Sequence, residues 1–304
     1  MIRKKIRIKL CIFAAPKGAI FKQINYFAMK IIAESSATRT EWAFVDGTTI
    51  VEHAYTSGMN PYFQTRRELS HSIRLELPET FFHKKIEHIY FYGAGCANQE
   101  KCKIMASSLI AQFRAPVTVQ SDLLGAARGL WVHKPGVACI IGTGSNSCYY
   151  DGNKIVKNVP PLGYILGDEG SSAYLGKMFL ADILKGIAPK DLSLDFYERH
   201  NVTSNMLLNE IYSGAMPSRG LARYGMFLSE HLDNQYVYEL VYKGFKLFFE
   251  RNIGAYDYKN NPVGIVGGTA MKFKKILEKA AKDYGAELAK IIPASMPGLI
   301  QFHK

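Results

Sequence analysis

The chain has 304 residues, of which 48% are apolar, and its formal net charge is +12. This composition is typical of a soluble globular protein of about two domains, long enough to bury a core without staples. The five cysteines are scattered and include no Cys-x-x-Cys pair, which excludes a zinc or disulfide framework and favours reduced thiols in a cytoplasm. No apolar run reaches the roughly 18 residues of a membrane helix, so no membrane partner is expected.

Much of the positive charge lies in residues 1–28, which contain seven basic residues and no acidic one. The other 276 residues therefore carry only +5, a mild excess that suits an anionic substrate such as ATP. We expect 1–28 to be a basic extension upstream of a start at Met29. It is too short to hold a helix-turn-helix, and no nucleic-acid partner is expected.

From Met29 the pattern alternates between strands and helices. Strands are predicted at 30–33, 42–46 and 48–53, with Asp46-Gly47 as a hairpin turn. A helix is predicted from Pro61 to Leu77, where Pro78 ends it. A strand at 86–92, a helix at 98–113 and a short strand at 116–119 follow.

The same series then begins again. Asp122 opens a helix at 123–132, followed by strands at 137–141, 145–150 and 154–159, with Asp151-Gly152 as the hairpin turn. Residues 172–252 are predicted to be mostly helical, with a strand at 262–266 and a helix at 269–284. This repetition predicts a duplicated α/β fold with domains 29–120 and 121–304 around a cleft. The second domain carries a helical insertion, and the last helix is expected to pack back on the first domain.

Two glycine turns lie close together, at 142–147 and 167–172, and each follows an apolar run that is predicted to be a strand end, at 137–141 and at 164–166. Because Gly142 and Gly144 have no side chains, the backbone is accessible here, and residues 143–146 can offer N–H groups and hydroxyls to a phosphate or a sugar. Hairpins also use glycine, so a purely structural role is the alternative for either turn alone.

Three further segments carry candidate chemistry. The link 34–42 between the first two strands is rich in hydroxyls, which suggests ligand contact, although it could be a solvated hairpin tip. Asp122 is either a helix N-cap or a base that accepts a proton from a substrate hydroxyl. The small residues of 264–270 suit either a flat ring against the backbone or close helix–strand packing. Histidines and cysteines form no metal-ligand cluster, so any metal is expected to be Mg²⁺ on carboxylates, waters and phosphates.

In this order, the five segments resemble those of the actin-like ATPase and sugar-kinase superfamily. The chain is most similar to its N-acetylglucosamine kinase branch, which is grouped with the BadF/BadG/BcrA/BcrD ATPases. The resemblance covers the chain from Met29 to the ending 296–300. It implies two ribonuclease-H-like domains that flank a cleft, with ATP, Mg²⁺ and an amino sugar bound between them. It also leaves a homodimer as an option.

The resemblance assigns roles to individual residues. Glu34 would hold Mg²⁺, and Asp122 would be the base that deprotonates the sugar hydroxyl. Thr143, Asn146 and Asp168 would help to bind the sugar. The residues assigned to ATP are Ser35, Ser36, Thr38, Arg39, Thr40, Gly142, Thr143, Gly144, Ser145, Gly267, Gly268 and Thr269.

The first loop differs from the family pattern Asp-x-Gly-x-Thr, because Glu34 stands at the acid and Ser36 at the glycine. A weakly active or non-catalytic nucleotide- or sugar-binding homologue is therefore one alternative. Another is an ATPase that activates a radical dehydratase, although the loop at 142–146 departs from the Gly-Gly-Gln-Asp type of that branch. We expect an ATP-dependent kinase of an N-acetylated amino sugar.

Overall fold

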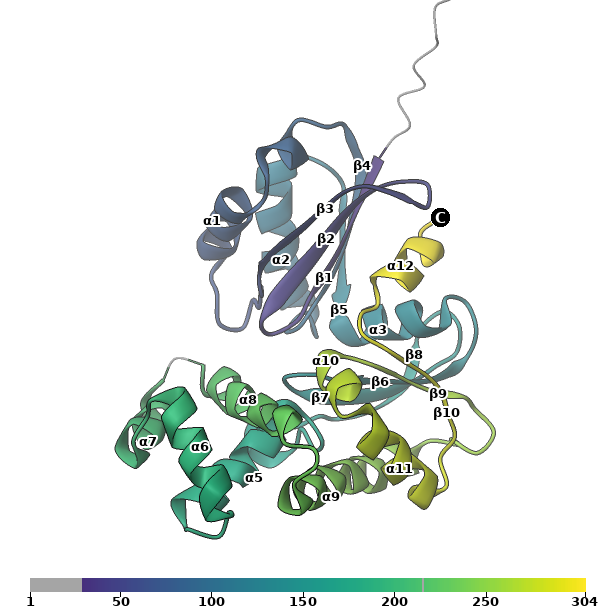
Figure 1. Ribbon diagram of the computed structural model, residues 1–304. Coiled ribbons are helices and arrows are strands. Elements are labelled where there is room, and N and C mark those ends of the chain that lie inside the picture. Colours follow the sequence, from purple (N-terminus) through teal and green to yellow (C-terminus); the bar gives the residue numbers. More distant parts are fainter. Residues whose placement is uncertain (1–28, 215) are drawn as a thin grey trace, which may run out of the picture.

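The computed structural model describes residues 29–214 and 216–304, so the segment 1–28 and its interpretation as an upstream extension lie outside the described residues. The chain forms an α/β protein with two five-stranded mixed sheets and surrounding helices, as predicted (Figure 1). The first half contains β1 (Met29–Ser35), β2 (Arg39–Asp46), β3 (Thr49–Ser57), α1 (Arg66–Glu76), the 3₁₀ helix η1 (Glu79–Phe82), β4 (Ile86–Gly93), α2 (Gln99–Phe113) and β5 (Val117–Ser121).

The second half is longer because several helices stand between its strands. In chain order it contains α3 (Asp122–Trp131), β6 (Gly136–Ile141), β7 (Ser145–Tyr150), β8 (Ile155–Val159), α4 (Gly163–Leu166), α5 (Ser172–Leu184), α6 (Lys190–His200), α7 (Ser204–Ser213), α8 (Pro217–Phe227), η2 (Leu228–Glu230), α9 (Gln235–Arg251), η3 (Ile253–Ala255), β9 (Val263–Val266), α10 (Gly268–Lys272), α11 (Lys274–Tyr284), β10 (Leu288–Ile292) and α12 (Met296–Phe302). Helices α5 to α8 form the helical insertion.

The two sheets have the same topology. The first has the order β3-β2-β1-β4-β5, and the second has the order β8-β7-β6-β9-β10. In each, a meander of three antiparallel strands is extended by two strands that run parallel to the first strand. The predicted duplication is therefore confirmed, and β1 and β6 occupy equivalent central places.

Both predicted hairpin turns have the residues that their backbones require. Gly47 and Gly152 have φ angles of +56° and +99°, in the region that favours glycine. One carboxylate oxygen of Asp151 accepts hydrogen bonds from the amides of Asn153 and Lys154, both at 2.8 Å. These turns fix the register in which β3 returns along β2 and β8 along β7.

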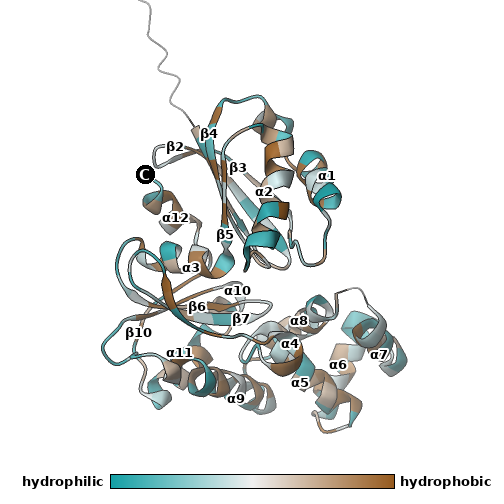
Figure 2. Ribbon diagram, turned by 180° about the vertical axis from the view of Figure 1, so that it is seen from behind, coloured by the Kyte–Doolittle hydropathy of each residue, from teal (hydrophilic) through white to brown (hydrophobic). Residues whose placement is uncertain are grey.

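Apolar side chains cover both faces of each sheet. Trp42, Phe44 and Phe91 are fully buried between the first sheet and the helices α1 and α2. The largest core lies between the second sheet and helices α5, α8, α9 and α11, while α3 covers the opposite face of that sheet. Helix α1, which is mostly teal in Figure 2, has a largely polar surface.

The last helix lies against the first half of the chain. Met296 and Leu299 of α12 share a core with Ile32 on β1. Helix α12 also crosses α3 closely, because a Cβ atom on Gly298 would lie 1.9 Å from the carbonyl oxygen of Gly129. Only glycine permits this approach, so α12 is fixed against both α3 and the first sheet.

Two predicted elements are corrected. The helix predicted from Pro61 begins at Arg66, because Thr65 caps it: its hydroxyl accepts from the amide of Glu68, whose carboxylate accepts from the amide of Thr65. The run 164–166, predicted as a strand, forms the short helix α4. Its apolar residues are largely exposed and pair with no strand, so their hydropathy was a misleading signal.

The C-terminal part differs from the prediction in two places. The helix predicted at 269–284 is interrupted at Phe273 into α10 and α11, and β10 was not predicted. No helix within the described residues is both long and apolar enough to cross a membrane. Four cysteines, Cys96, Cys102, Cys139 and Cys148, are free thiols.

Candidate functional site

A cleft of about 540 Å³ is lined by both halves of the chain. It brings together the β1–β2 turn, the start of α3, the β6–β7 turn, the segment from β9 into α10, and residues of α8 and of the link before α12. The predicted site residues on its lining are Glu34, Ser35, Ser36, Thr38, Arg39, Asp122, Gly142, Thr143, Gly267, Gly268 and Thr269.

Sheet topology explains this convergence. Strands β1 and β5 run parallel to β4, and β6 and β9 are parallel neighbours. Parallel strands end at the same edge of their sheet, and ligands of open α/β sheets bind outside this edge. The β1–β2 turn, α3, the β6–β7 turn and α10 each follow the carboxyl end of one of these strands.

The β1–β2 turn is shorter than predicted and holds itself together by hydroxyl groups. Ser35 and Thr40 are fully buried, and their hydroxyls lie 2.8 Å apart. Ser36 Oγ accepts from the amides of Thr38 and Arg39, at 3.4 and 3.3 Å, and donates to the Arg39 carbonyl at 3.0 Å. Thr40 therefore stabilises the turn through its contact with Ser35. The backbone amides of Thr38 and Arg39, which could donate to a phosphate, already donate to Ser36.

Two of the three carboxyl groups on the cleft lining, those of Glu34 and Asp122, resist ionisation. Both are half-buried at its base. Desolvation, helped by the neighbouring charges of Glu41 and Asp122 and opposed by two hydrogen bonds from Ser295, raises the pKa of Glu34 to about 7. Desolvation also raises the pKa of Asp122 to about 6. Both groups therefore change charge near neutral pH.

Asp122 is not the N-cap of α3. Ser121 is the cap, and its hydroxyl accepts from the amide of Leu124 at 3.2 Å. The Asp122 carboxylate accepts only from the adjacent amide of Leu123, at 2.8 Å, among the hydrogen bonds of the described side chains. Because Ser121 performs the capping, the Asp122 carboxylate is available to the cleft.

The β6–β7 turn is fixed by the two segments beside it. The Gly142 carbonyl accepts from the amide and hydroxyl of Ser172, at 2.9 and 3.1 Å, and from the hydroxyl of Thr269 at 2.9 Å. Gly267 has a φ of +141°, and a Cβ there would lie 2.2 Å from the carbonyl oxygen of Ile141. Gly267 is therefore required for close packing against Ile141. A Cβ on Gly268, in contrast, would lie within 4 Å of no other atom.

The remaining predicted residues lie beside the cleft and not on its lining. Asp168, at a φ of +55°, accepts from the amide of Ser145 at 3.2 Å, and desolvation raises its pKa to about 6. A Cβ on Gly144 would lie 3.1 Å from the Asp168 carboxylate, so glycine makes room for it. The Ser145 hydroxyl donates to the Glu169 carbonyl at 2.9 Å. Asn146 accepts from Asn158 Nδ2 at 3.0 Å. The roles of Asn146 and Asp168 in sugar binding stay predictions.

The cleft lining around Glu34 fits a magnesium ion. Mg²⁺ prefers oxygen ligands, keeps several waters, and takes only one or two carboxylates together with substrate phosphates. Glu34 would supply one such carboxylate from the cleft lining, which also carries Asp122, the predicted base. Within residues 29–214 and 216–304 no group of three or more His, Cys, Asp or Glu is placed to hold a metal ion by itself.

Sequence reasoning missed several polar residues of the site, among them Lys272 of α10 and three residues that come from distant segments. Arg219 and Arg223, on α8, line the cleft, and Ser295 reaches it by bonding to Glu34. No local pattern marks them, because each lies far along the chain from the segment that it meets.

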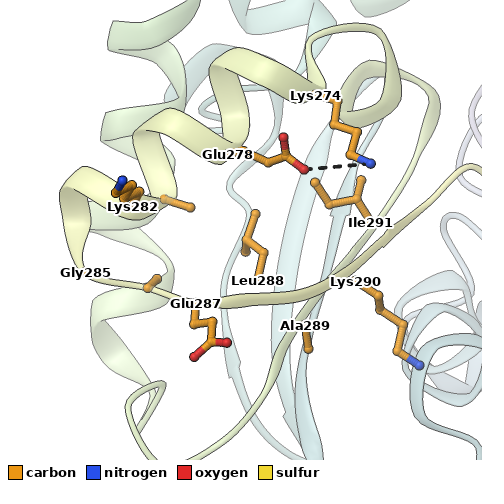
Figure 3. Close-up of a pocket in the computed structure, with 11 residues that line it drawn as sticks. Lys274, Glu278, Lys282, Gly285, Glu287, Leu288, Ala289, Lys290 and Ile291 are labelled. Atoms are coloured by element: carbon orange, nitrogen blue, oxygen red, sulfur yellow. Dashed lines mark ion pairs between the residues drawn. The ribbon is translucent and has the colours of Figure 1, made fainter.

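Two other hollows are of similar size but of different chemistry. One of about 520 Å³ lies along α11 and β10, where Lys274 pairs with Glu278 at 3.8 Å (Figure 3). The other, of about 560 Å³, lies on α1 and α2 and is lined by Arg66, Arg67 and Arg74 among others. Neither contains a predicted site residue, so chemistry and not size selects the cleft.

Comparison with known proteins shows the family and the fold of this chain. A solved structure from Porphyromonas gingivalis, described as a candidate N-acetylglucosamine kinase, is 38% identical over 90% of this chain and 98% of its own, with a TM-score of 0.87. A protein of the same description from Chromobacterium violaceum (16% identity, 92% and 100% covered, TM-score 0.64) and a candidate N-acetylmannosamine kinase from Listeria monocytogenes (13%, 90% and 98%, 0.51) share the fold. No protein-family model and no curated protein matches the chain.

Proposed function

Because the chain belongs to the N-acetylglucosamine kinase-like family of actin-like ATPase sugar kinases, we propose that it phosphorylates an N-acetylated amino sugar with ATP. The observation that carries this proposal is the Asp122 carboxylate, which lines the cleft while Ser121 caps α3. A base with a pKa near the working pH can both accept a proton and be ionised in most molecules.

In the proposed reaction, a sugar hydroxyl attacks the γ-phosphorus of ATP. The new bond joins the sugar oxygen to phosphorus, the bond from the γ-phosphorus to the β–γ bridging oxygen breaks, and ADP leaves with that electron pair. Asp122 accepts the hydroxyl proton. The two cleft turns position the phosphates, and phosphoryl transfer depends mainly on such positioning. Glu34 would hold Mg²⁺, which when bound neutralises charge on the phosphates.

The test is ADP release by the purified protein with Mg-ATP and a panel of sugars. N-acetylglucosamine or a related amino sugar should raise release, and Asp122→Asn should abolish the increase. Glu87→Gln, which removes an exposed carboxylate on β4, is the matched control and should retain full activity. If no sugar in a broad panel raises ADP release above background, the kinase proposal fails.

A second candidate is a binding protein with little turnover. It is favoured by Ser36, whose hydroxyl contacts two amides of the first loop. In that case the wild type binds nucleotide without sugar-dependent ADP release. Turnover in a Glu34→Asp, Ser36→Gly double variant would then identify the first loop as its cause. A homodimer also remains a prediction.

A further inference from the structure

We propose that Arg219 is a phosphate-binding residue, which contacts the nucleotide from α8, beside the β1–β2 turn. This inference rests on the proposed function, because it requires a nucleotide in the cleft. It assigns a role to the helical insertion, which contributes none of the residues that the sequence predicted to bind ATP.

The position of Arg219 motivates the proposal. It lies in the first turn of α8, is half-buried, and lines the same cleft as Ser36 and Thr38. Its guanidinium donates a hydrogen bond to the carbonyl of Ala37, between those two residues and 182 positions away in sequence. The side chain therefore already spans from the second half of the chain to the loop that is expected to hold phosphate.

The helix that carries Arg219 is held rigidly. Helices α5 and α8 cross at Gly176 and Gly225, where a Cβ on Gly176 would lie 1.9 Å from the Leu221 carbonyl and one on Gly225 would lie 2.0 Å from the Ser172 carbonyl. Ser172 in turn donates to the β6–β7 turn. The guanidinium is thus positioned by the same packing that positions the second loop of the cleft.

Of the cations on the cleft lining, Arg223 forms an ion pair within the described residues, whereas Arg219, Arg39 and Lys272 form none. Arg223, one turn further along α8, pairs with Glu210 at 2.9 Å, and Arg39 lies over the ring of Tyr55 at 4.4 Å. Among the described residues, Arg219 forms no ion pair, and its one hydrogen bond goes to a neutral carbonyl. A guanidinium has five N–H donors in a planar fork, which matches the oxygens of a phosphate.

The alternative is that Arg219 only supports the turn. Ala37 lies close to Gly58, where a Cβ would be 2.7 Å from the Ala37 carbonyl oxygen, so the turn has little space to move. A support would help every ligand of the turn equally, whereas a phosphate contact would help only phosphorylated ligands. Comparing ADP with adenosine separates the two roles.

The experiment measures the affinity of ADP and of adenosine for the wild type, Arg219→Gln, Arg219→Lys and Arg199→Gln, with thermal unfolding as a check that each variant folds. Arg199 lies on α6, outside the cleft lining, and is the matched control. We expect Arg219→Gln to weaken ADP binding about tenfold or more, because a charge-assisted hydrogen bond is lost. Adenosine affinity should not change. Arg219→Lys should recover part of the loss, because it keeps the charge, and Arg199→Gln should bind ADP like the wild type.

The inference is overturned if Arg219→Gln binds ADP as tightly as the wild type. It is also overturned if ADP and adenosine lose affinity equally, which identifies a support. A folded wild type that binds ADP but phosphorylates no sugar contradicts the proposed kinase activity and leaves the Arg219 comparison valid. A wild type that binds no ADP contradicts both.

Discussion

Ser295 holds the carboxylate of Glu34 with two hydrogen bonds, one from its hydroxyl at 2.8 Å and one from its amide at 3.2 Å. The two residues are 261 positions apart, and Ser295 is fully buried at the start of α12. The acid expected to hold Mg²⁺ is therefore oriented by the C-terminal helix. The position of α12 against α3 and the geometry of the metal-binding acid are thus linked.

This linkage predicts a specific dependence on pH. Asp122 and Glu34 must both be ionised in the proposed reaction. Their pKa values are raised to about 6 and about 7, respectively. Kinase activity should therefore rise as the pH increases from 5 to 8. The hydrogen bonds from Ser295 lower the pKa of Glu34, so Ser295→Ala should move this rise to higher pH and increase the KM for Mg-ATP.

The measurement is kcat/KM against pH for both proteins. Ser193→Ala, which removes a helix hydroxyl in α6 outside the cleft, is the control. A profile that is flat down to pH 5, or one that Ser295→Ala leaves in place, contradicts this account of Glu34.

Asp122→Asn should stabilise the protein at alkaline pH while it abolishes activity. Because the pKa of Asp122 is raised from 3.8 to about 6, folding favours its protonated form, and the free energy of unfolding falls as the pH rises from about 4 to about 6. The neutral side-chain amide of the Asp122→Asn variant avoids this loss of stability. We expect a gain of about 1 kcal/mol at pH 8, reduced by partial solvent screening, and almost none at pH 4. Urea unfolding at both pH values measures it, and lower stability of the variant at pH 8 contradicts it.

Ser36→Gly should improve nucleotide binding. The change removes the hydroxyl that contacts the amides of Thr38 and Arg39, so both amides become free to donate to phosphate. We expect the KM for ATP to fall about fivefold, the effect of roughly one net hydrogen bond. Ala37→Gly adds the same flexibility to the turn without releasing the amides, and it should give no such improvement. Equal effects of the two changes would assign any gain to flexibility.

Gly267 and Gly268 form a matched pair for stability. Gly267→Ala places a Cβ at a φ of +141° and 2.2 Å from the Ile141 carbonyl, so it should destabilise the fold by about 2 kcal/mol or more. Gly268→Ala meets no atom within 4 Å and should leave stability almost unchanged. Thermal unfolding compares them. If Gly268→Ala nevertheless weakens adenosine binding, the base packs at that residue, and similar melting temperatures for both variants would contradict the argument from packing.

The sequence allowed the fold to be predicted where local chemistry determines it. The turns Asp46-Gly47 and Asp151-Gly152 marked equivalent hairpins, and the duplicated series led to the two sheets that the structure has. The strand β10 escaped prediction because it is a short edge strand with exposed residues such as Lys290. The run 164–166 had strand-like hydropathy but lacks a strand partner, and hydropathy alone cannot reveal that.

The candidate site could be predicted only in part for a related reason. Glycine turns and polar loops are local signals, and eleven of the predicted residues do line the cleft. The contacts of Arg219 with Ala37 and of Ser295 with Glu34 join segments 182 and 261 positions apart. Such pairs arise from tertiary packing, so no local sequence pattern marks either Arg219 or Ser295.

The central claim is that Asp122 takes the proton of an amino-sugar hydroxyl during phosphoryl transfer from ATP. Mass spectrometry of the products tests it most directly, after the protein has been incubated with Mg-ATP and N-acetylated amino sugars. The account predicts one equivalent of phosphorylated sugar for each ADP formed by the wild type, and none from folded Asp122→Asn. A wild type that makes ADP without a phosphosugar, or an Asp122→Asn variant that makes the phosphosugar at the wild-type rate, would contradict it.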